Sequence, residues 1–197
     1  MIKMNFIQMV TNYRPSCTQE AEDRQTILRY AQLAGPGVLE RSDSIAHVTS
    51  SAFVLDTSLS HVLLVRHSLR GSWSWPGGHA DGNPDLLSVA IRECREETGV
   101  RQLTPLSEQI ASLDIFAVPA HWKNGDYVGA HLHFSVGFCL VCDRRQPLRP
   151  CPRENTAVEW FPLDFITDER FSDADTALYQ RLIVRAKMFS QPKECLK

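Results

Sequence analysis

The sequence predicts an α/β protein in which a mixed β-sheet is covered by helices on both sides. Two β-rich segments, residues 47–56 and 61–67, are separated by the polar stretch TSLS and are typical of a hairpin. A helix with an apolar face follows over residues 84–98, between further β-rich segments. An amphipathic helix over residues 173–189 closes the chain. This mixed order of strands and helices favours layers of helix packed on sheet.

The first 45 residues are expected to form an N-terminal helical extension. Residues 18–34 have apolar side chains at helical spacing, and the sequence GPG directly after them ends the helix. Thr18 is the expected N-cap of this helix, with acidic residues in the first turn. The sequence therefore divides into an extension, residues 1–45, and a larger α/β domain, residues 46–190.

The second half of the chain supplies the remaining strands. Residues 110–122 are expected to form one or two strands, and the sequence KNGD after them is a turn signal. Residues 127–142 are expected to form one long strand. A polar loop with several prolines follows over 143–155, and residues 157–166 are expected to form a final strand and turn. The helix over 84–98 is expected to begin at Asn83-Pro84 and to end at Gly99.

Composition excludes several classes of function. The net charge of −2 provides no basic field, so no stable nucleic-acid partner is expected. No stretch approaches the roughly 18 apolar residues that a membrane helix needs, and the first residues do not resemble a signal peptide. The expected compartment is the cytoplasm, where the six cysteines would be mostly reduced.

Three glutamates of the helix over 84–98 are spaced to lie on one side of it: Glu93, Glu96 and Glu97. Residues three and four apart share a narrow arc of a helix that turns by about 100° per residue. Carboxylates so close together repel one another, and Arg92 offsets only part of this repulsion. The pattern has two interpretations: a solvated charged face, or a site for a hard divalent cation. The glycine pair shortly before the helix favours the cation, because glycine lets the backbone approach a ligand closely.

Residues 78–100 resemble the Nudix box, whose pattern is G-x5-E-x7-R-E-U-x-E-E-x-G-U, with U an aliphatic residue. Gly78 matches the first glycine, and the run Arg92–Val100 matches the second half, with Cys94 in an aliphatic position. Pro84 stands where the pattern has its first glutamate. In the family that glutamate pairs with the box arginine, so the departure leaves the partner of the arginine open.

The resemblance extends beyond the box, from about residue 47 to the final helix, and includes WSWPGGH at 73–79 and EWFPLD near the end. It implies a Nudix-type α/β/α sandwich with a mixed β-sheet, with residues 46–190 as a Nudix hydrolase domain. Members of this family split a diphosphate linkage with bound Mg²⁺ or Mn²⁺. The resemblance therefore implies a pyrophosphohydrolase that acts on a nucleoside diphosphate linked to another moiety, or on a nucleoside triphosphate.

Carried over to this chain, the box residues receive definite roles. Glu93, Glu96 and Glu97 are the expected metal ligands, and the Gly78 carbonyl is an expected further ligand. Glu93 is either a ligand or the general base, and Arg92 orients the glutamates. Glu93, Glu97 and Arg92 form the expected catalytic set. A bound cation screens phosphate charge and lowers the pKa of the attacking water.

Residues outside the box are candidates for substrate contacts. Glu154 and Glu159 precede or enter the last strand, and each is either a surface carboxylate or an additional acidic residue of the site. His131 and His133 share one strand face, which could line the substrate cleft, and the alternative is a structural or surface role. His79 adjoins the box and is placed near the metal site.

Two alternatives to hydrolysis remain at this point. A Nudix fold can serve as a non-catalytic nucleotide-binding or sensor module, although such proteins usually have a damaged box. Prenyl diphosphate isomerases share a Nudix-like fold, but they need a cysteine and glutamate pair for which the sequence shows no convincing segment. The identity of the substrate depends on loops outside the box. The sequence leaves the oligomeric state open, and a homodimer is one option because members of the family often dimerise.

Overall fold

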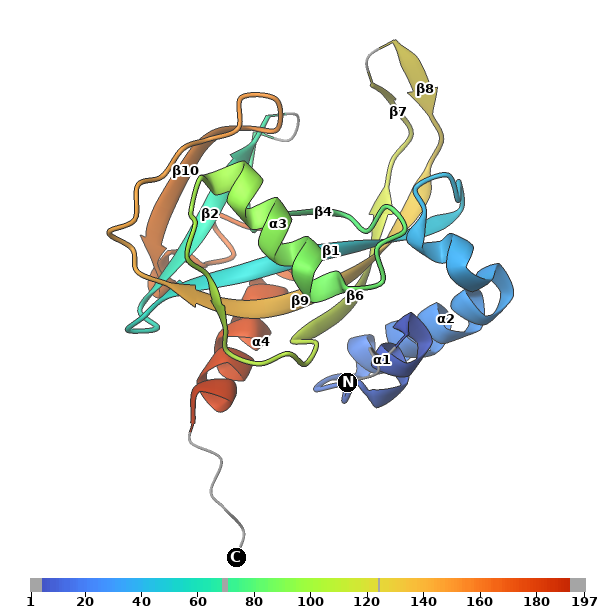
Figure 1. The fold of residues 1–197 in the computed structure, drawn as a ribbon, viewed down its shortest axis with the longest axis horizontal. Coiled ribbons are helices and arrows are strands. Elements are labelled where there is room, and N and C mark those ends of the chain that lie inside the picture. The colour runs from blue at the N-terminus through green and yellow to red at the C-terminus, as the bar shows by residue number, and fades with distance from the viewer. Residues whose placement is uncertain (1–4, 69–70, 124, 192–197) are drawn as a thin grey trace, which may run out of the picture.

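The computed structural model describes residues 5–68, 71–123 and 125–191, and within these ranges it confirms an α/β fold with a mixed sheet. Eight strands form one sheet, and two more form a separate hairpin. Helices lie on both sides of the sheet, with α3 in front of it and α4 behind it in the view of Figure 1. Among the described residues, no helix has the length and apolar character needed to span a membrane.

The central strand pair determines how the sheet is built. The main path runs β10–β2–β1–β9–β5, while β3, β4 and β6 pair with β2, β1 and β9. β1 pairs in parallel with β9 along its whole length and antiparallel with β2 and β4. The strands of this sheet are β1 (Ala46–Asp56), β2 (His61–His67), β3 (Trp73–Ser74), β4 (Gly77–His79), β5 (Thr104–Pro105), β6 (Ser112–Val118), β9 (His131–Cys142) and β10 (Asn155–Pro162).

Helices cover the two faces of this sheet, and the N-terminal helices flank it. The predicted helix over 18–34 is confirmed, and it packs against β6. The helices are α1 (Phe6–Asn12), α2 (Thr18–Ala34), α3 (Leu86–Thr98) and α4 (Asp173–Ser190), with 3₁₀ turns η1 (Gly35–Leu39) and η2 (Leu163–Phe165).

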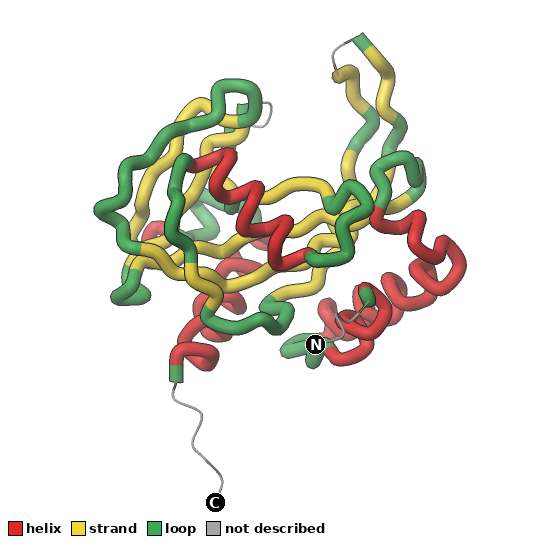
Figure 2. Tube along the Cα trace, viewed as in Figure 1, coloured by secondary structure: helices red, strands yellow, loops and turns green. Residues whose placement is uncertain are grey.

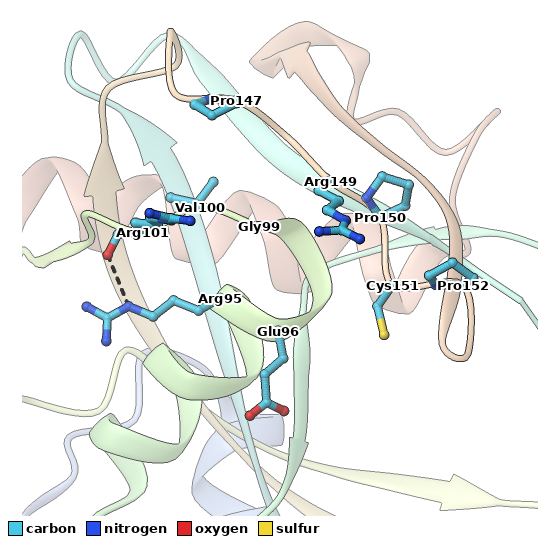
Figure 3. A pocket seen from close by; sticks show the side chains of 10 residues that line it. All are labelled: Arg95, Glu96, Gly99, Val100, Arg101, Pro147, Arg149, Pro150, Cys151 and Pro152. Atoms are coloured by element: carbon cyan, nitrogen blue, oxygen red, sulfur yellow. Dashed lines mark hydrogen bonds between the residues drawn. The ribbon is translucent and has the colours of Figure 1, made fainter.

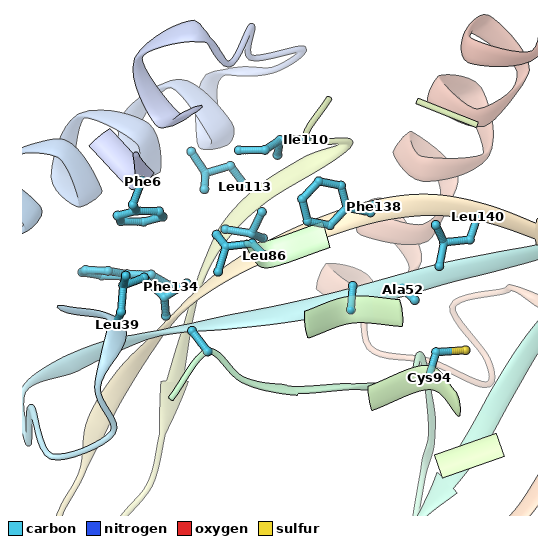
Figure 4. Close-up of a cluster of buried hydrophobic side chains, with 14 of the residues drawn as sticks. Phe6, Leu39, Ala52, Leu86, Cys94, Ile110, Leu113, Phe134, Phe138 and Leu140 are labelled. Carbon is cyan, nitrogen blue, oxygen red and sulfur yellow. The ribbon is translucent and has the colours of Figure 1, made fainter. Parts of the chain in front are cut away.

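Alternate residues of β1 supply the two hydrophobic cores. Val48 and Ala52 face the core that lies under α3 and the N-terminal helices, where Figure 4 labels Leu86. Phe53 and Leu55 point to the opposite face and pack in the core under α4. Successive side chains of a strand alternate between faces, so one fully buried strand serves both layers.

Three local expectations were wrong in detail. The N-cap of α3 is Asp85, whose carboxylate accepts a hydrogen bond from Ser88 N at 3.2 Å, so the helix begins after Pro84. The N-cap of α2 is Cys17, which makes no side-chain cap, in place of Thr18. The expected strand over 127–142 is divided, because its first residues turn back to form β8 (Asp126–Val128) with β7 (His121–Lys123). This hairpin extends away from the sheet (Figure 2).

A buried ion cluster connects α2 to α4. The Glu20 side chain is fully buried, and it accepts hydrogen bonds from Ser16 N at 2.6 Å and from Arg185 Nη2 at 3.0 Å. Arg181 Nε lies 3.5 Å from the same carboxylate. The N-terminal helices are therefore held to the C-terminal helix by ion pairs.

Substitution of Glu20 by alanine is expected to destabilise the protein strongly. The change leaves two mostly buried guanidinium groups without this partner, and breaking a buried pair from one side costs about 3–5 kcal/mol. The free energy of unfolding from urea denaturation measures the effect. Glu22→Ala removes an exposed carboxylate from the same helix and is the control, expected to change the free energy by about 0.5 kcal/mol or less. Equal effects of the two substitutions would contradict this role of Glu20.

Candidate active site

The glycine turn of β4 lies directly against α3. Gly77 N donates a hydrogen bond to Glu97 Oε1 at 2.8 Å, which ties the strand to the helix. β4 pairs with β1, where the Cα atoms of Ser51 and Gly77 are opposite each other. A Cβ atom on Gly78 would overlap the carboxylate of Glu93. The absence of a side chain at Gly78 therefore allows the Glu93 carboxylate to approach the backbone, and its absence at Gly77 allows β4 to lie close to β1.

The box glutamates of α3 open onto a cleft of about 430 Å³. Glu93, Glu96 and Glu97 all line it, and Glu154 joins them from the loop before β10. Glu97 is 6% exposed, whereas Glu96 is exposed to solvent. The structure thus brings four carboxylates from two distant segments to one cavity.

Burial and crowding change the acidity of these carboxylates. Burial raises the pKa of Glu97 to about 8, and the nearby charges of Glu154 and Glu93 add to the shift. Burial also raises the pKa of Glu93, where Arg92 acts in the opposite direction. A buried carboxylate that lies beside other carboxylates ionises less readily unless positive charge compensates it.

The partner of Arg92 is a residue of the box itself. Arg92 Nη2 lies 2.7 Å from Glu93 Oε1, so this ion pair stands in place of a pair with residue 84. Asp85 is used to cap the helix, and its own N–H donates to Asn83 Oδ1 at 2.9 Å. The departure at Pro84 therefore changes the start of the helix and leaves the glutamates in place.

Glu154 and Glu159 occupy different environments. Glu154 lines the cleft at the start of β10, next to Asn155, whose Nδ2 donates to the Glu97 carbonyl at 3.0 Å. Glu159 is exposed on β10 opposite Leu64 of β2, and it is not among the described residues that line the cleft. Of the two candidates, the structure brings only Glu154 to the box glutamates.

The histidine candidates gather at the cleft. His79 and His133 line it, and His131 lies beside them with its Nε2 atom 3.2 Å from His133 Nε2. His47 of β1 is buried against all three rings. Burial lowers the pKa of His47, so its ring is neutral at physiological pH.

Arg41, Asp175 and Tyr179 line the cleft but carried no signal in the sequence. Asp175 and Tyr179 come from α4, and Trp75 packs edge-on against Tyr179 with ring centroids 6.1 Å apart. Arg41 lines the rim and donates from Nε to Asp81 Oδ1 at 2.6 Å. Arg41, Asp175 and Tyr179 lie far from the box along the chain, and only the sheet pairing and helix packing bring them to it.

A second, wider hollow of about 1030 Å³ lies at the C-terminal end of α3 (Figure 3). Arg95, Arg101 and Arg149 line it together with several prolines of the 147–152 loop. Arg95 Nε donates to the Arg101 carbonyl at 3.1 Å. Glu96 lines both hollows, so the arginine-rich surface adjoins the carboxylate cleft.

This fold, with its glutamate helix packed on a glycine turn, is that of a Nudix protein. Residues 46–182 match the family model of the NUDIX domain, and the chain belongs to that family. The predicted resemblance to the Nudix family is thereby confirmed.

Relatives with sequence similarity carry Nudix names. The mouse protein "Nucleoside diphosphate-linked moiety X motif 6" is 28% identical over 141 residues, which cover 66% of this chain and 39% of the mouse protein. A Bacillus subtilis protein, "Uncharacterized Nudix hydrolase YvcI", is 26% identical over 114 residues, covering 58% of this chain and 66% of the relative. The chain thus spans less than half the length of the mouse relative.

Solved structures share the fold at lower sequence identity. The E. coli dihydroneopterin triphosphate pyrophosphohydrolase superposes with a TM-score of 0.52 and 14% identity, over 70% of this chain and 94% of the other. At this identity the likeness concerns the fold alone.

Proposed function

We propose that this chain is a divalent-cation-dependent pyrophosphohydrolase that acts on a nucleoside diphosphate linked to another moiety, or on a nucleoside triphosphate. The observation that carries the proposal is the convergence of Glu93, Glu96, Glu97 and Glu154 on one cleft beside a glycine turn. A nucleotide-binding module without catalysis would not need this set of carboxylates. Family membership and the names of the relatives support hydrolysis as the reaction.

The carboxylate set fits Mg²⁺ or Mn²⁺. Both are hard cations that prefer oxygen ligands, and Mg²⁺ usually binds one or two carboxylates, waters and substrate phosphates. Burial raises the pKa of Glu97 to about 8, and a bound cation would supply positive charge that favours its ionised form. We assign Glu93, Glu96, Glu97 and the Gly78 carbonyl as the residues that would hold the cation. When bound, the cation would screen phosphate charge and lower the pKa of the attacking water.

The other residues of the cleft have positions suited to holding and activating the reactants. The Gly77 N–H and Asn155 fix the end of α3 that carries Glu97. Arg92 holds Glu93, whose pKa is raised by burial, as suits a group that accepts a proton from water near neutral pH. Arg41 at the rim is paired with Asp81, and its planar guanidinium would bind phosphate oxygens by exchanging this partner. Together these residues would orient a diphosphate with one phosphorus atom facing an activated water.

Two further expectations belong with this proposal. We assign residues 46–190 as the Nudix hydrolase domain and residues 1–45 as its helical extension. The extension packs on β6 and through Glu20 on α4, so it supports the domain from the side. The six cysteines and the lack of a membrane-spanning helix among the described residues are consistent with a cytoplasmic protein.

A substrate panel tests the proposal. Nucleoside triphosphates, sugar nucleotides, dinucleoside polyphosphates and cofactor diphosphates would be incubated with the protein in Mg²⁺, in Mn²⁺ and in excess chelator, and phosphate or pyrophosphate release would be measured. Cleavage of one class that requires the cation is the expected result. Binding of a nucleotide without cleavage of any compound would favour a sensor module.

Substitution of Glu154 and Glu159 separates the two candidates outside the box. Glu154→Gln is expected to lower kcat by roughly 10- to 100-fold, because it removes a negative charge from the cleft of the box glutamates, where Glu154 lies close enough to raise the pKa of Glu97. Glu159→Gln makes the same chemical change on the exposed surface of β10 and is expected to leave kcat within about twofold. Steady-state kinetics on the substrate found in the panel measure both. A larger loss of kcat in Glu159→Gln than in Glu154→Gln would contradict this choice and place the additional carboxylate of the site on β10.

A further inference from the structure

Three strands bring histidine rings together at one side of the cleft: His47 on β1, His79 on β4, and His131 and His133 on β9. His47 is paired with His133 in the parallel ladder, and Thr49, two residues further along β1, is paired with His79. Residues two apart on a strand share a face, and diagonal neighbours are within reach of long side chains. The register therefore gathers four rings, with neighbouring ring centroids 4.9–5.1 Å apart.

The backbone fixes which nitrogen of His47 carries the proton. Its Nδ1 atom lies 2.9 Å from the Asp43 carbonyl oxygen, which can only accept, so Nδ1 is the donor. The lone pair of the neutral ring is then on Nε2. This atom is buried, the residue is 4% exposed, and no described residue forms a hydrogen bond with Nε2. A buried acceptor without a partner costs free energy, and a bound cation would satisfy it.

A second chain of hydrogen bonds orients His133. His131 Nδ1 lies 2.8 Å from the Gly129 carbonyl oxygen, so His131 also carries its proton on Nδ1 and its lone pair on Nε2. Nε2 of His133 lies 3.2 Å from Nε2 of His131 and donates a hydrogen bond to it. In a neutral His133 ring the lone pair is then on Nδ1. Histidines that bind metals typically donate their other ring N–H to such an acceptor, which fixes ring orientation and tautomer.

We propose that His47, His79 and His133 bind one Zn²⁺ ion at a site separate from the box carboxylates. One ring nitrogen from each of the three residues lies within 4.8 Å of the others. Zn²⁺ binds imidazole nitrogen at about 2.0–2.1 Å, so the three nitrogens would move closer together to bind one ion. Imidazole ligands favour Zn²⁺ and the ions of copper, nickel and iron, whereas Mg²⁺ and Mn²⁺ prefer carboxylates and water. The two sites therefore select different metals.

The ion would connect three strands that are distant in sequence. β4 carries the glycine turn that receives Glu97, so an ion bound to His79 would fix this turn against β1 and β9. Three protein ligands leave a further coordination position for water or substrate. His79 and His133 line the cleft, so that position would be reached from the side where the diphosphate is proposed to bind.

Metal titration of the untagged 197-residue chain tests the site. The protein would be dialysed against chelator, its zinc content measured, and Zn²⁺ titrated in the presence of a chromophoric competitor and excess Mg²⁺. One equivalent of Zn²⁺ that excess Mg²⁺ does not displace is expected. Co²⁺ in place of Zn²⁺ should give the visible absorption of a nitrogen-ligated, four- or five-coordinate ion.

Matched variants locate the ligands. His79→Gln and His133→Gln keep much of the side-chain volume and are expected to weaken Zn²⁺ binding by at least roughly 100-fold. His121→Gln removes a histidine from β7, outside the cluster, and Glu97→Gln changes the carboxylate site, so both should retain wild-type zinc affinity. Circular dichroism and metal-free melting temperatures verify that the variants are folded.

Three results would overturn the proposal: no Zn²⁺ bound above the level of His133→Gln, displacement of Zn²⁺ by Mg²⁺, or an affinity that falls in Glu97→Gln. None of them depends on hydrolysis. Failure of the zinc site would leave the proposed hydrolase intact, and failure of hydrolysis would leave the zinc titration interpretable.

Discussion

Glu97→Gln is expected to lower kcat by about 10³-fold or more while the protein remains folded. The substitution removes one negative charge from the proposed cation site and keeps an oxygen that can accept from Gly77 N–H. The loss should appear in kcat at saturating Mg²⁺, because a weaker and displaced cation stabilises the transition state less. Steady-state kinetics over a range of Mg²⁺ concentrations measure the loss of activity.

The stability of metal-free Glu97→Gln distinguishes this effect from unfolding. Burial raises the pKa of Glu97 from 4.5 to about 8, so the folded state binds the proton more tightly than the unfolded state. Ionisation of Glu97 therefore opposes folding increasingly as pH rises from 4.5 towards 8. The uncharged glutamine avoids this cost, and the metal-free variant should melt no lower than the wild type at pH 8.

Glu108→Gln is the control for general effects of removing a carboxylate. Glu108 is exposed and lies outside the cleft, so the change should leave both kcat and the melting temperature near their wild-type values. Wild-type activity of Glu97→Gln with Mg²⁺ would contradict the assignment of the box glutamates as the cation site.

The two glycines of the turn are expected to respond differently to alanine. In Gly78→Ala, the new methyl group overlaps the carboxylate of Glu93, which is the far end of a flexible side chain and can move. The protein should fold, but Glu93 should be displaced, and a misplacement of about 1 Å at a reacting group can cost roughly 100-fold in rate. Kinetics and thermal melting of the purified variant measure the two effects.

In Gly77→Ala, the methyl group meets Ser51 Oγ and the main chain, with Ser50 O at 2.7 Å. The backbone of buried β1 cannot move without disturbing its ladders, so the cost falls on stability, at about 1–3 kcal/mol or more. Gly77→Ala should therefore lower the melting temperature more than Gly78→Ala does. A large loss of stability in Gly78→Ala would contradict this account, because it would mean that the new methyl group meets more than the flexible Glu93 side chain.

Local patterns predicted the elements that depend on local rules. The spacing of Glu93, Glu96 and Glu97 on one helix was readable because helical periodicity is a property of adjacent residues. Gly99 was predicted to end that helix, and it does so with a φ of 76°, a conformation that glycine adopts readily. The helix start was placed two residues too early, because Asn83 and Asp85 are both competent caps and the structure uses Asp85.

Contacts between distant strands could not be predicted in the same way. His79, His131 and His133 were predicted near the site, but the position of His47 depends on parallel pairing of β1 with β9, which no local pattern encodes. Glu154 and Glu159 are only five residues apart. Glu154 precedes β10, which starts at Asn155, and lies in the cleft, whereas Glu159 lies within β10 and outside the cleft. Asp175 and Tyr179 enter the cleft because α4 packs across the sheet.

The most direct test of the central claim is ³¹P NMR of a nucleoside diphosphate derivative incubated with the protein and Mg²⁺. Loss of the diphosphate resonances and growth of monophosphate resonances, stopped by excess chelator and absent with Glu97→Gln, is the predicted result. Unchanged diphosphate resonances for every compound of the panel, with a nucleotide raising the melting temperature of both proteins equally, would contradict it.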